Sequence, residues 1–381
     1  MTKEIKYIGF YDIPEEGMKR VSSLAAINKM NYISDAINQA GYDVRIVSPS
    51  WASDTRVKGT FQKGRTLQIN PHKKVTFCPT FTYYNKIAGY LKIILALVWL
   101  FLWLLKNVKR NEKIIVYHVQ WLSLPIRMAK KIIKFHLILE VEELYQTIWM
   151  NRKIFNKWEM QLIKSADSYI PVSEQLADKF GNKVKAIVYG DYTVYKLEKN
   201  KGIQKVGIDV VYAGSIDHLR GAAMNAVLCA ELLPEKYTVH ILGSGDENII
   251  KELLKTINEI NTRCLRTAVV YHGVKIGTDY HNFLLNCDIA INSQREGDYM
   301  NMAFPSKVIS YLSHNLVVIS TRIRSIEKSK LSNLITFSED DKPASIVKSI
   351  QSIDFNNTTD NASQIQKLND DFVNFLYRFL A

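Results

Sequence analysis

The segment from residue 287 to residue 321 contains residue types that could bind a phosphate. A short apolar strand (288–292) leads through a polar loop to Pro305-Ser306-Lys307, where the pattern predicts a helix, and a second apolar strand (316–321) follows. The Ser306 hydroxyl can cap this helix, and Pro305 rigidifies its entry. Because a helix in such a unit begins at the carboxyl edge of a parallel sheet, its free N–H groups, its dipole and the Lys307 ammonium would converge on an anion. The alternative is a well-capped helix with a solvated lysine.

The same segment resembles the donor-binding segment of GT-B glycosyltransferases, especially the family-4-like enzymes of bacterial surface-polysaccharide synthesis. Those enzymes read E-G, then F-P-S-K, then E-Y-L-A-x-G-x-P-V-I. This chain matches them at Glu296-Gly297, Phe304-Pro305-Ser306-Lys307, Tyr311-Leu312 and Val318-Ile319. It departs from them at Ser310, Asn315 and Val317. Ser310 stands where the family usually has a glutamate that contacts the nucleotide ribose.

Three other strand ends carry glycines or a cation that would lie at the same sheet edge. The strand 208–213 is followed by Gly214-Ser215 and then Arg220, the strand 237–242 by Gly243-Ser244-Gly245, and the strand from 269 by His272-Gly273. Glycine lets a backbone approach a ligand closely, and arginine can pair with phosphate. The resemblance implies that these turns bind the nucleotide diphosphate donor. A solvated Arg220 is the alternative, and a single G-x-G is weak evidence.

The first half of the chain has polar residues at the ends of two predicted strands. The strand 114–118 ends in His118-Val-Gln-Trp121, and the strand from 137 ends in carboxylates that include Glu143. GT-B enzymes similar to this chain place a histidine or a carboxylate there, facing the acceptor, so Glu143 is a candidate general base. A cluster of capping carboxylates, with His118 as a structural hydrogen-bonding group, is the alternative. Arg20, in the loop after the first strand, could reach the acceptor or lie on the surface.

The most apolar stretch runs from Leu91 to Leu105 and has lysines on both sides. Its apolar run from Ile93 is about 13 residues long, which is short of the ~20 that span a bilayer. We therefore expect a helix that lies in a membrane interface with its basic ends on anionic headgroups. A buried core helix is the alternative.

Composition narrows the class of protein. The chain has 381 residues, of which 47% are hydrophobic, and a formal net charge of +13 at pH 7. This favours a folded protein with an anionic partner. No nucleic-acid-binding motif is present, so we expect no nucleic acid partner. The four cysteines have no metal-type spacing, and we expect reduced thiols and no metal. The N-terminus reads as a strand and not as a signal peptide, which favours a cytoplasmic protein.

The expected architecture is α/β of the GT-B type, with two doubly wound Rossmann-like domains that face a cleft. We expect an acceptor domain (1–195), a linker (196–206), a nucleotide-sugar domain (207–355) and a C-terminal helix (356–381) that crosses back to the first domain. The resemblance implies transfer of a sugar from a nucleotide diphosphate sugar to a hydroxyl, with a lipid-linked saccharide as acceptor, on the inner face of the cell membrane. Capsule or O-antigen synthesis is the implied context.

The resemblance also implies how the residues would act. Arg220, Ser306 and Lys307 would neutralise the leaving diphosphate, and Glu296 would hold the donor sugar hydroxyls, without a cofactor. Retention of the anomeric configuration is expected, with inversion through Glu143 as the alternative. The change at Ser310 keeps a second class open, a non-catalytic GT-B subunit that partners an active enzyme, and a GT-B epimerase is a third.

Overall fold

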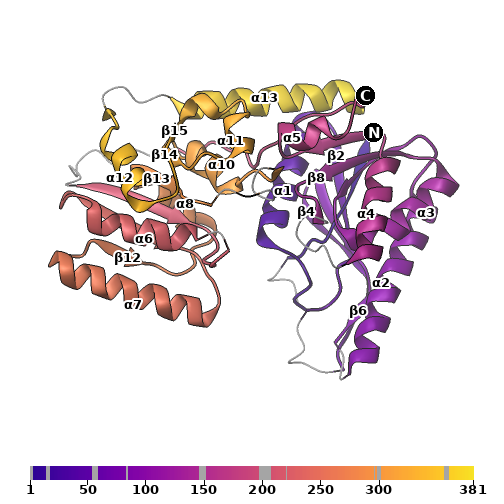
Figure 1. Ribbon diagram of the computed structural model, residues 1–381. Helices are drawn as coiled ribbons and strands as arrows, with labels where there is room; N and C mark the ends of the chain where they lie inside the picture. The colour runs from indigo at the N-terminus through magenta and orange to yellow at the C-terminus, as the bar shows by residue number, and fades with distance from the viewer. Residues whose placement is uncertain are drawn as a thin grey trace. The chain divides into compact units, whose positions relative to one another are not determined.

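The computed structural model describes residues 3–13, 18–53, 59–82, 85–145, 152–196, 207–219, 221–295, 297, 302–355 and 360–381. The chain divides into two compact units, which are drawn in Figure 1: residues 1–191 with 370–381 form unit 1, and residues 192–369 form unit 2. Each unit is built on one large, mainly parallel sheet with helices on its faces. The expected α/β class with two Rossmann-like units is confirmed.

The sheet of unit 1 has seven strands in the order β4-β5-β2-β1-β7-β8-β9. All neighbouring pairs are parallel except β4 with β5. The apolar runs at its centre explain the buried, two-sided sheet, since Ile5, Ile46, Val116 and Leu139 are almost fully buried. The strands are β1 Glu4–Ile8, β2 Asp43–Ser48, β4 Arg65–Asn70, β5 Lys73–Phe77, β7 Lys113–Tyr117, β8 His136–Val141 and β9 Ser168–Pro171, with a small separate pair, β3 Phe61–Gln62 and β6 Thr80–Phe81.

The helices of unit 1 follow the crossovers between these strands. Ser23 caps the first of them, since its hydroxyl accepts a hydrogen bond from the Ala26 N–H at 3.1 Å. The helices are α1 Leu24–Gln39, α2 Lys86–Asn107, α3 Ser123–Ile133, α4 Lys153–Ser165 and α5 Glu174–Asp178, with the short 3-10 turn Gln120–Leu122 before α3. The last helix, α13 Asn361–Leu380, has its residues from 370 onward in unit 1, where Phe372 stacks on Tyr32.

The sheet of unit 2 has six parallel strands in the order β12-β11-β10-β13-β14-β15. Its core is aliphatic, and Val210, Val239 and Ile289 are fully buried in it. The strands are β10 Ile208–Ala213, β11 Tyr237–Leu242, β12 Val269–Tyr271, β13 Ile289–Asn292, β14 Val317–Ser320 and β15 Ile335–Phe337; the helices are α6 Ala222–Leu232, α7 Glu247–Cys264, α8 Gly277–Leu285, α10 Ser306–Ser313, α11 Arg324–Glu327 and α12 Pro343–Gln351.

The start of α10 differs from the sequence prediction. The expected strand–helix–strand unit is present, and Asn315 has the left-handed φ of 59° expected after the helix. However, Pro305 is the N-cap residue and no side chain caps the helix, because Ser306 is already its first helical residue. The prediction of a Ser306 cap is therefore wrong, and the first N–H groups of α10 have no hydroxyl partner from it.

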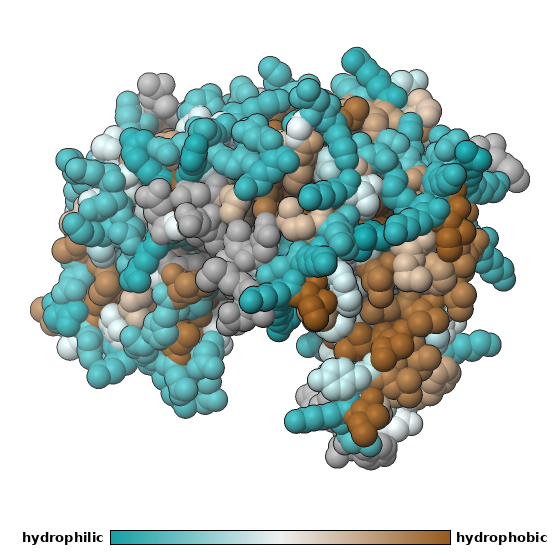
Figure 2. All heavy atoms as spheres, turned by 45° about the vertical axis from the view of Figure 1, so that its right-hand side comes forward, coloured by the Kyte–Doolittle hydropathy of each residue, from teal (hydrophilic) through white to brown (hydrophobic). Residues whose placement is uncertain are grey.

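Helix α2 is longer than its apolar run suggested. It has 22 residues, and its length and composition would suffice to cross a membrane. Its buried residues are Gly89, Lys92, Ala96, Leu100 and Leu104, a single stripe at three- and four-residue spacing. Only 28% of its most apolar window is buried, so it is not the fully buried core helix of the alternative. Figure 2 shows the hydrophobic side chains that gather where α2 lies.

The ends of β10 and β11 approach each other so closely that a side chain does not fit between them. A Cβ atom on Gly243 would lie 1.8 Å from the carbonyl oxygen of Gly214, and Gly243 has a φ of +137°. The neighbouring turn differs, because a Cβ atom on Gly273, with a φ of +69°, would have no atom within 4 Å.

We predict that Gly243→Ala destabilises the protein by at least about 3 kcal/mol, because a backbone clash is added to an unfavourable φ. Gly273→Ala is the matched control, and it should cost about 1 kcal/mol for its left-handed φ alone. Urea unfolding of both variants measures the difference. Equal losses of stability in the two variants would show that the ends of β10 and β11 can move apart to fit a side chain at no energetic cost.

Candidate functional site

The carboxyl edge of the unit 2 sheet gathers most of the predicted donor-binding residues. The Gly214 N–H donates to the carbonyl of Leu242 at 3.0 Å, and the Gly243 N–H donates to the carbonyl of Gly273 at 2.8 Å. Gly245 is held against the same edge, since a Cβ atom on it would lie 2.1 Å from the Ile216 carbonyl oxygen. The turns after β10, β11 and β12 therefore form one backbone surface, at the strand ends where ligands bind in open α/β sheets.

Lys307 extends from the first turn of α10 to this surface. Its Nζ donates to the Tyr212 hydroxyl at 3.1 Å and lies 4.1 Å from the centre of the Tyr212 ring. A Cβ atom on Gly214 would lie 2.9 Å from Nζ, so glycine at this position gives the ammonium its room. Tyr212 in turn donates to the carbonyl of Ser215 at 2.8 Å. The structure thus brings Pro305, Ser306 and Lys307 together with Gly214 and Ser215.

A buried tyrosine ties α10 to the sheet. The Tyr311 hydroxyl donates to the carbonyl of Ala213 at 3.1 Å and accepts from the N–H of the same residue at 2.8 Å. The side chain is fully buried, and burial raises the pKa of Tyr311 well above its usual range. The phenol is therefore neutral and satisfies both backbone groups at once. This contact holds α10 beside the end of β10.

Ser310 is paired with a residue that the sequence did not point to. Its hydroxyl lies 3.0 Å from the hydroxyl of Tyr280, from α8. Burial raises the pKa of Tyr280. Next to this pair, His314 Nδ1 lies 2.5 Å from the carbonyl of Ser310, and Tyr195 stacks on His281 with ring centres 3.9 Å apart. A neutral hydroxyl pair therefore stands at the position where the family resemblance predicts a glutamate.

His272 belongs to a chain of three polar side chains. Its Nε2 lies 3.0 Å from Nδ1 of His240, and Nε2 of His240 lies 3.0 Å from a carboxylate oxygen of Asp209. Burial lowers the pKa of His272, and the neighbouring His240 adds to this effect. The lowered pKa favours a neutral imidazole at pH 7, so His272 offers hydrogen bonds without a positive charge.

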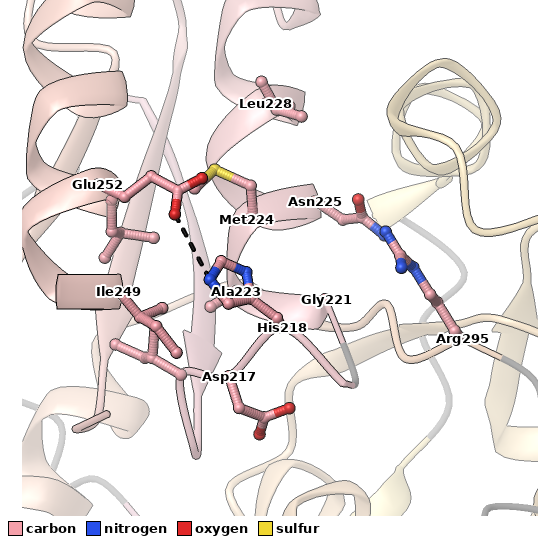
Figure 3. A pocket seen from close by; sticks show the side chains of 12 residues that line it. Asp217, His218, Gly221, Ala223, Met224, Asn225, Leu228, Ile249, Glu252 and Arg295 are labelled. Atoms are coloured by element: carbon pink, nitrogen blue, oxygen red, sulfur yellow. Dashed lines mark ion pairs between the residues drawn. The ribbon is translucent and has the colours of Figure 1, made fainter. Parts of the chain in front are cut away.

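A pocket of about 310 Å³ adjoins this edge between α6 and α7 (Figure 3). Its polar lining includes Asp217, His218 and Glu252, and His218 Nε2 lies 3.5 Å from a carboxylate oxygen of Glu252. Arg295 also lines it, and its Nε would lie 3.1 Å from a Cβ atom on Gly221, the N-cap residue of α6. Sequence reasoning missed Arg295, which precedes Glu296 and adds a cation near the start of α6. Arg220 and Glu296 themselves lie outside the described residues, and their roles stay predictions.

The candidate acceptor side lies in unit 1, at the ends of β7 and β8. His118 is buried, and its Nδ1 lies 3.2 Å from the carbonyl of Glu143. Its Nε2 lies 3.5 Å from a carboxylate oxygen of Glu159 but forms no hydrogen bond with it. Burial lowers the pKa of His118 to about 4, so the ring is neutral at pH 7 and this contact is not an ion pair. His118 therefore supports the backbone at Glu143, whose side chain is half-buried.

Two carboxylates beside Glu143 form a buried network. The Tyr7 hydroxyl donates to Glu140, which is fully buried, and Glu142 lies 3.2 Å from Lys29 Nζ. Lys29 is also buried and donates to the carbonyl of Val188 at 2.5 Å. Burial raises the pKa of Glu140 well above its usual range, and the negative charge of Glu142 adds to this. Glu140 therefore keeps its proton to a higher pH than an ordinary glutamate does.

The two residues predicted on the acceptor side have different surroundings. Arg20 is buried and not on the surface, and its guanidinium donates to the carbonyls of Ser50 at 2.5 Å and Cys78 at 3.0 Å. Trp121 is half-buried and packs edge-on against Trp51, with ring centres 5.7 Å apart, and against Phe155 at 5.0 Å. Trp121 thus belongs to an aromatic cluster that sequence spacing could not reveal. Across the described residues, no group of three or more His, Cys, Asp or Glu side chains is placed to hold a metal ion.

We predict that the free energy of unfolding of the Glu140→Gln variant increases relative to that of the native protein as the pH rises. Glu140 ionises near 4.5 in the unfolded chain, whereas its raised folded pKa keeps the proton on to higher pH. Its contribution is thus fully present below pH 4.5 and is lost above it as the pH rises through the folded pKa. Glutamine cannot ionise and still accepts from Tyr7, so the variant should gain on the native protein by roughly 1 kcal/mol or more between pH 4.5 and pH 8.

Urea unfolding across this pH range checks the prediction. Glu247→Gln is the control, because this side chain is 82% exposed on α7. A stability difference between Glu140→Gln and the native protein that stays constant with pH would refute the raised pKa.

Comparisons with known proteins place the fold. No family model matches the chain, and no curated protein matches its sequence. Solved structures do match: a sucrose-phosphate synthase from Thermosynechococcus elongatus (13% identity, TM-score 0.69, 99% of both chains) and a UDP-forming α,α-trehalose-phosphate synthase from Burkholderia xenovorans in complex with glucose-6-phosphate (12% identity, TM-score 0.68, 99% of this chain and 98% of that chain). An E. coli protein bound with UDP-2-fluoro glucose matches at 10% identity and a TM-score of 0.67, over 99% of this chain and 98% of that chain. Over its full length, the chain therefore has the GT-B fold.

Proposed function

We propose that this protein is a glycosyltransferase that moves a sugar from a nucleotide diphosphate sugar to a hydroxyl of a saccharide acceptor. The observation that carries the proposal is the position of Lys307. Its ammonium lies at the Gly214 turn, beside the first turn of α10, at the carboxyl edge of the unit 2 sheet. A cation, free helix N–H groups and closely packed glycine turns are the groups that a diphosphate needs.

The chemistry follows from the charge that develops when the sugar–phosphate bond breaks. The leaving nucleotide diphosphate gains negative charge, which Lys307, the α10 N–H groups and Arg220 would stabilise more strongly in the transition state than in the ground state. Glu296 would accept hydrogen bonds from the sugar hydroxyls and favour the positive charge at the anomeric carbon. The cationic side chains make a metal ion unnecessary for this step.

The donor and the stereochemistry are proposed from the site and the similar structures. His272 and the Gly243–Gly273 backbone contact suit the base of a nucleotide, and one similar structure is bound with UDP-2-fluoro glucose. Trehalose-6-phosphate synthase, another match (10% identity, TM-score 0.68), has been studied for glycosyl transfer with retention. We therefore propose retention, with Glu143 as the base of an inverting reaction as the alternative.

The acceptor is proposed to be a lipid-linked saccharide, and the protein to be cytoplasmic and peripheral on the inner face of the cell membrane. The exposed apolar faces of α2 support this location, because Ile94 is 56% and Leu102 57% exposed. Its buried stripe attaches α2 to unit 1 along its length, which favours a helix that lies on a membrane over one that crosses it. Capsule or O-antigen synthesis is the proposed context.

One observation favours a second candidate function. The Ser310–Tyr280 hydroxyl pair replaces the usual ribose contact, which suits a non-catalytic GT-B subunit that partners an active enzyme. A panel of nucleotide sugars tested for thermal stabilisation separates the candidates. A cognate donor at ~100 Kd adds about 2.7 kcal/mol of stability. Hydrolysis or transfer by the isolated chain supports the enzyme, stabilisation without turnover supports the subunit, and a change of the donor without acceptor supports an epimerase.

We predict that Lys307→Ala weakens nucleoside diphosphate binding at least tenfold and nucleoside binding much less, since the ammonium faces phosphate and not the base. Lys328→Ala is the control, because this exposed lysine follows α11 in the same unit and its loss changes the charge equally. Calorimetry with both ligands measures the effect. An equal loss for the nucleoside and the diphosphate would remove Lys307 from the phosphate site.

We predict that Glu296→Gln lowers kcat by roughly a hundredfold, about 2.7 kcal/mol of transition-state stabilisation, and barely changes affinity for the nucleoside diphosphate product. The reason is that the carboxylate would act on the transferred sugar and on the charge at its anomeric carbon. Steady-state kinetics and calorimetry measure the two quantities, with exposed Glu339→Gln as the control. An unchanged kcat would make Glu296 a solvated loop residue, and a large loss of product affinity would assign it to the ribose.

A further inference from the structure

The surface of unit 1 beside α2 carries a second feature, a groove lined by cations. The groove, about 430 Å³ in volume, lies between α3 and the end of α4. Its lining residues are Arg127, Lys130, Lys131, Lys134, Gln161, Lys164 and Ser165. Among the described residues no carboxylate lines it, so five positive charges lie close together there. We call these residues the basic groove.

Within the described residues, most of these cations have no carboxylate partner. Lys130 forms an ion pair with Asp167. For Arg127, Lys131, Lys134 and Lys164, the described part of the chain shows no ion pair or side-chain hydrogen bond. Like charges that are held together repel one another, and this costs stability unless an anion binds among them. The groove is therefore matched in charge to a phosphate from outside the chain.

Helix α3 joins the basic groove to an apolar surface. Leu124, Met128 and Ile132 are spaced four residues apart and are 41%, 45% and 62% exposed. Because residues at i and i+4 lie on one helix face, these three form one apolar stripe, and Arg127 and Lys131 form a basic stripe beside it. Figure 1 shows α2, α3 and α4 next to one another in unit 1.

Helix α2, which packs against α3, also exposes apolar side chains. The exposed apolar residues of α2 are Ile87, Tyr90, Leu91, Ile94, Leu95, Val98, Leu102 and Leu105, with exposed fractions between 37% and 81%. Figure 2 shows the hydrophobic area that results, bordered by hydrophilic side chains. Contiguous exposed apolar patches usually mark an interaction site. Most of the cations of the basic groove lie on the neighbouring α3, and an anionic membrane surface attracts such cations.

We propose that the basic groove binds the phosphate headgroups of anionic phospholipids while the exposed faces of α2 and α3 enter the interface of the same bilayer. This proposal rests on the peripheral location proposed above and adds to it a lipid-selective site. A soluble phosphate would use the cations but leave the apolar faces in water, whereas a bilayer presents both chemistries side by side. The groove would therefore select anionic membranes and set how unit 1 is oriented on them.

The test measures binding of the full chain to vesicles of phosphatidylcholine with and without 30% phosphatidylglycerol. Lys131→Gln/Lys134→Gln removes two exposed cations of the groove, and Lys251→Gln/Lys255→Gln is the control with the same charge change on exposed α7. Each lysine near an anionic surface contributes about fivefold, so the groove variant should bind the anionic vesicles roughly 25-fold more weakly. The control should bind as the native protein does.

Further experiments distinguish the contribution of the basic groove to vesicle binding from that of α2. Ile94→Ser/Leu102→Ser on α2 should weaken binding to both kinds of vesicle, while the groove variant should keep the native affinity for neutral vesicles. Raising the salt from about 0.1 M to 0.5 M should remove most of the preference for anionic vesicles. Circular dichroism checks that each variant is folded.

Native affinity of the groove variant for anionic vesicles would overturn the proposal. So would calorimetry that shows the variant losing affinity for inorganic phosphate with vesicle binding unchanged, since the groove would then take a soluble anion. Donor binding is read out separately by thermal stabilisation with nucleotide sugars. The two proposals can therefore fail separately. If no nucleotide sugar stabilises the protein, sugar transfer is refuted. If Lys131→Gln/Lys134→Gln still weakens binding to anionic vesicles, the lipid site is supported all the same.

Discussion

The candidate donor site of this molecule depends on one buried phenol. Tyr311 satisfies both the N–H and the carbonyl of Ala213, which ties the helix that carries Lys307 to the strand that ends in Gly214. Strand β13 pairs with β10 only at Val210 and Val211, so the hydroxyl supplies the hydrogen bonds that β13 does not make at Ala213. Together with the contact between Lys307 and Tyr212, this link holds the ammonium close to the Gly214 turn. Preorganised charge of this kind costs no rearrangement when a phosphate binds.

Unit 1 differs in its electrostatics, because several of its ionisable side chains are buried. Arg20 is surrounded by backbone carbonyls, and Lys29 neutralises Glu142. Glu140 accepts a hydrogen bond from the Tyr7 hydroxyl, and its raised pKa keeps the carboxyl group protonated. Burial without a full set of partners is expensive, so such groups are retained where they do something other than stabilise. Glu140 and Glu142 lie at the end of β8, close to Glu143 in the sequence, so a change in their charge would be felt at the candidate acceptor side.

The sequence predicted more of the fold than of the candidate site. Strand and helix periodicity placed both sheets, and the F-P-S-K segment located α10, because these signals are local. The Ser306 cap failed because the helix begins one residue earlier than the hydroxyl needs. The length of α2 was underestimated because Lys92 was counted as a polar end, whereas its Nζ is buried and donates to the carbonyl of Ala52 at 2.5 Å. Tyr280, Glu159 and Arg295 were missed because their contacts span tens of residues and leave no spacing pattern.

The Ser310–Tyr280 pair changes the balance of charge at the donor edge. A glutamate at this position would add a negative charge near the ribose, whereas two neutral hydroxyls at 3.0 Å offer hydrogen bonds without charge. The pair also satisfies itself, so a ribose must compete with it for each hydroxyl. Ribose binding through this edge would then gain less than binding through a carboxylate, since charge-assisted hydrogen bonds are about twice as strong as neutral ones. Recognition of a donor would therefore shift toward its diphosphate, on Lys307, and toward its base, at His272.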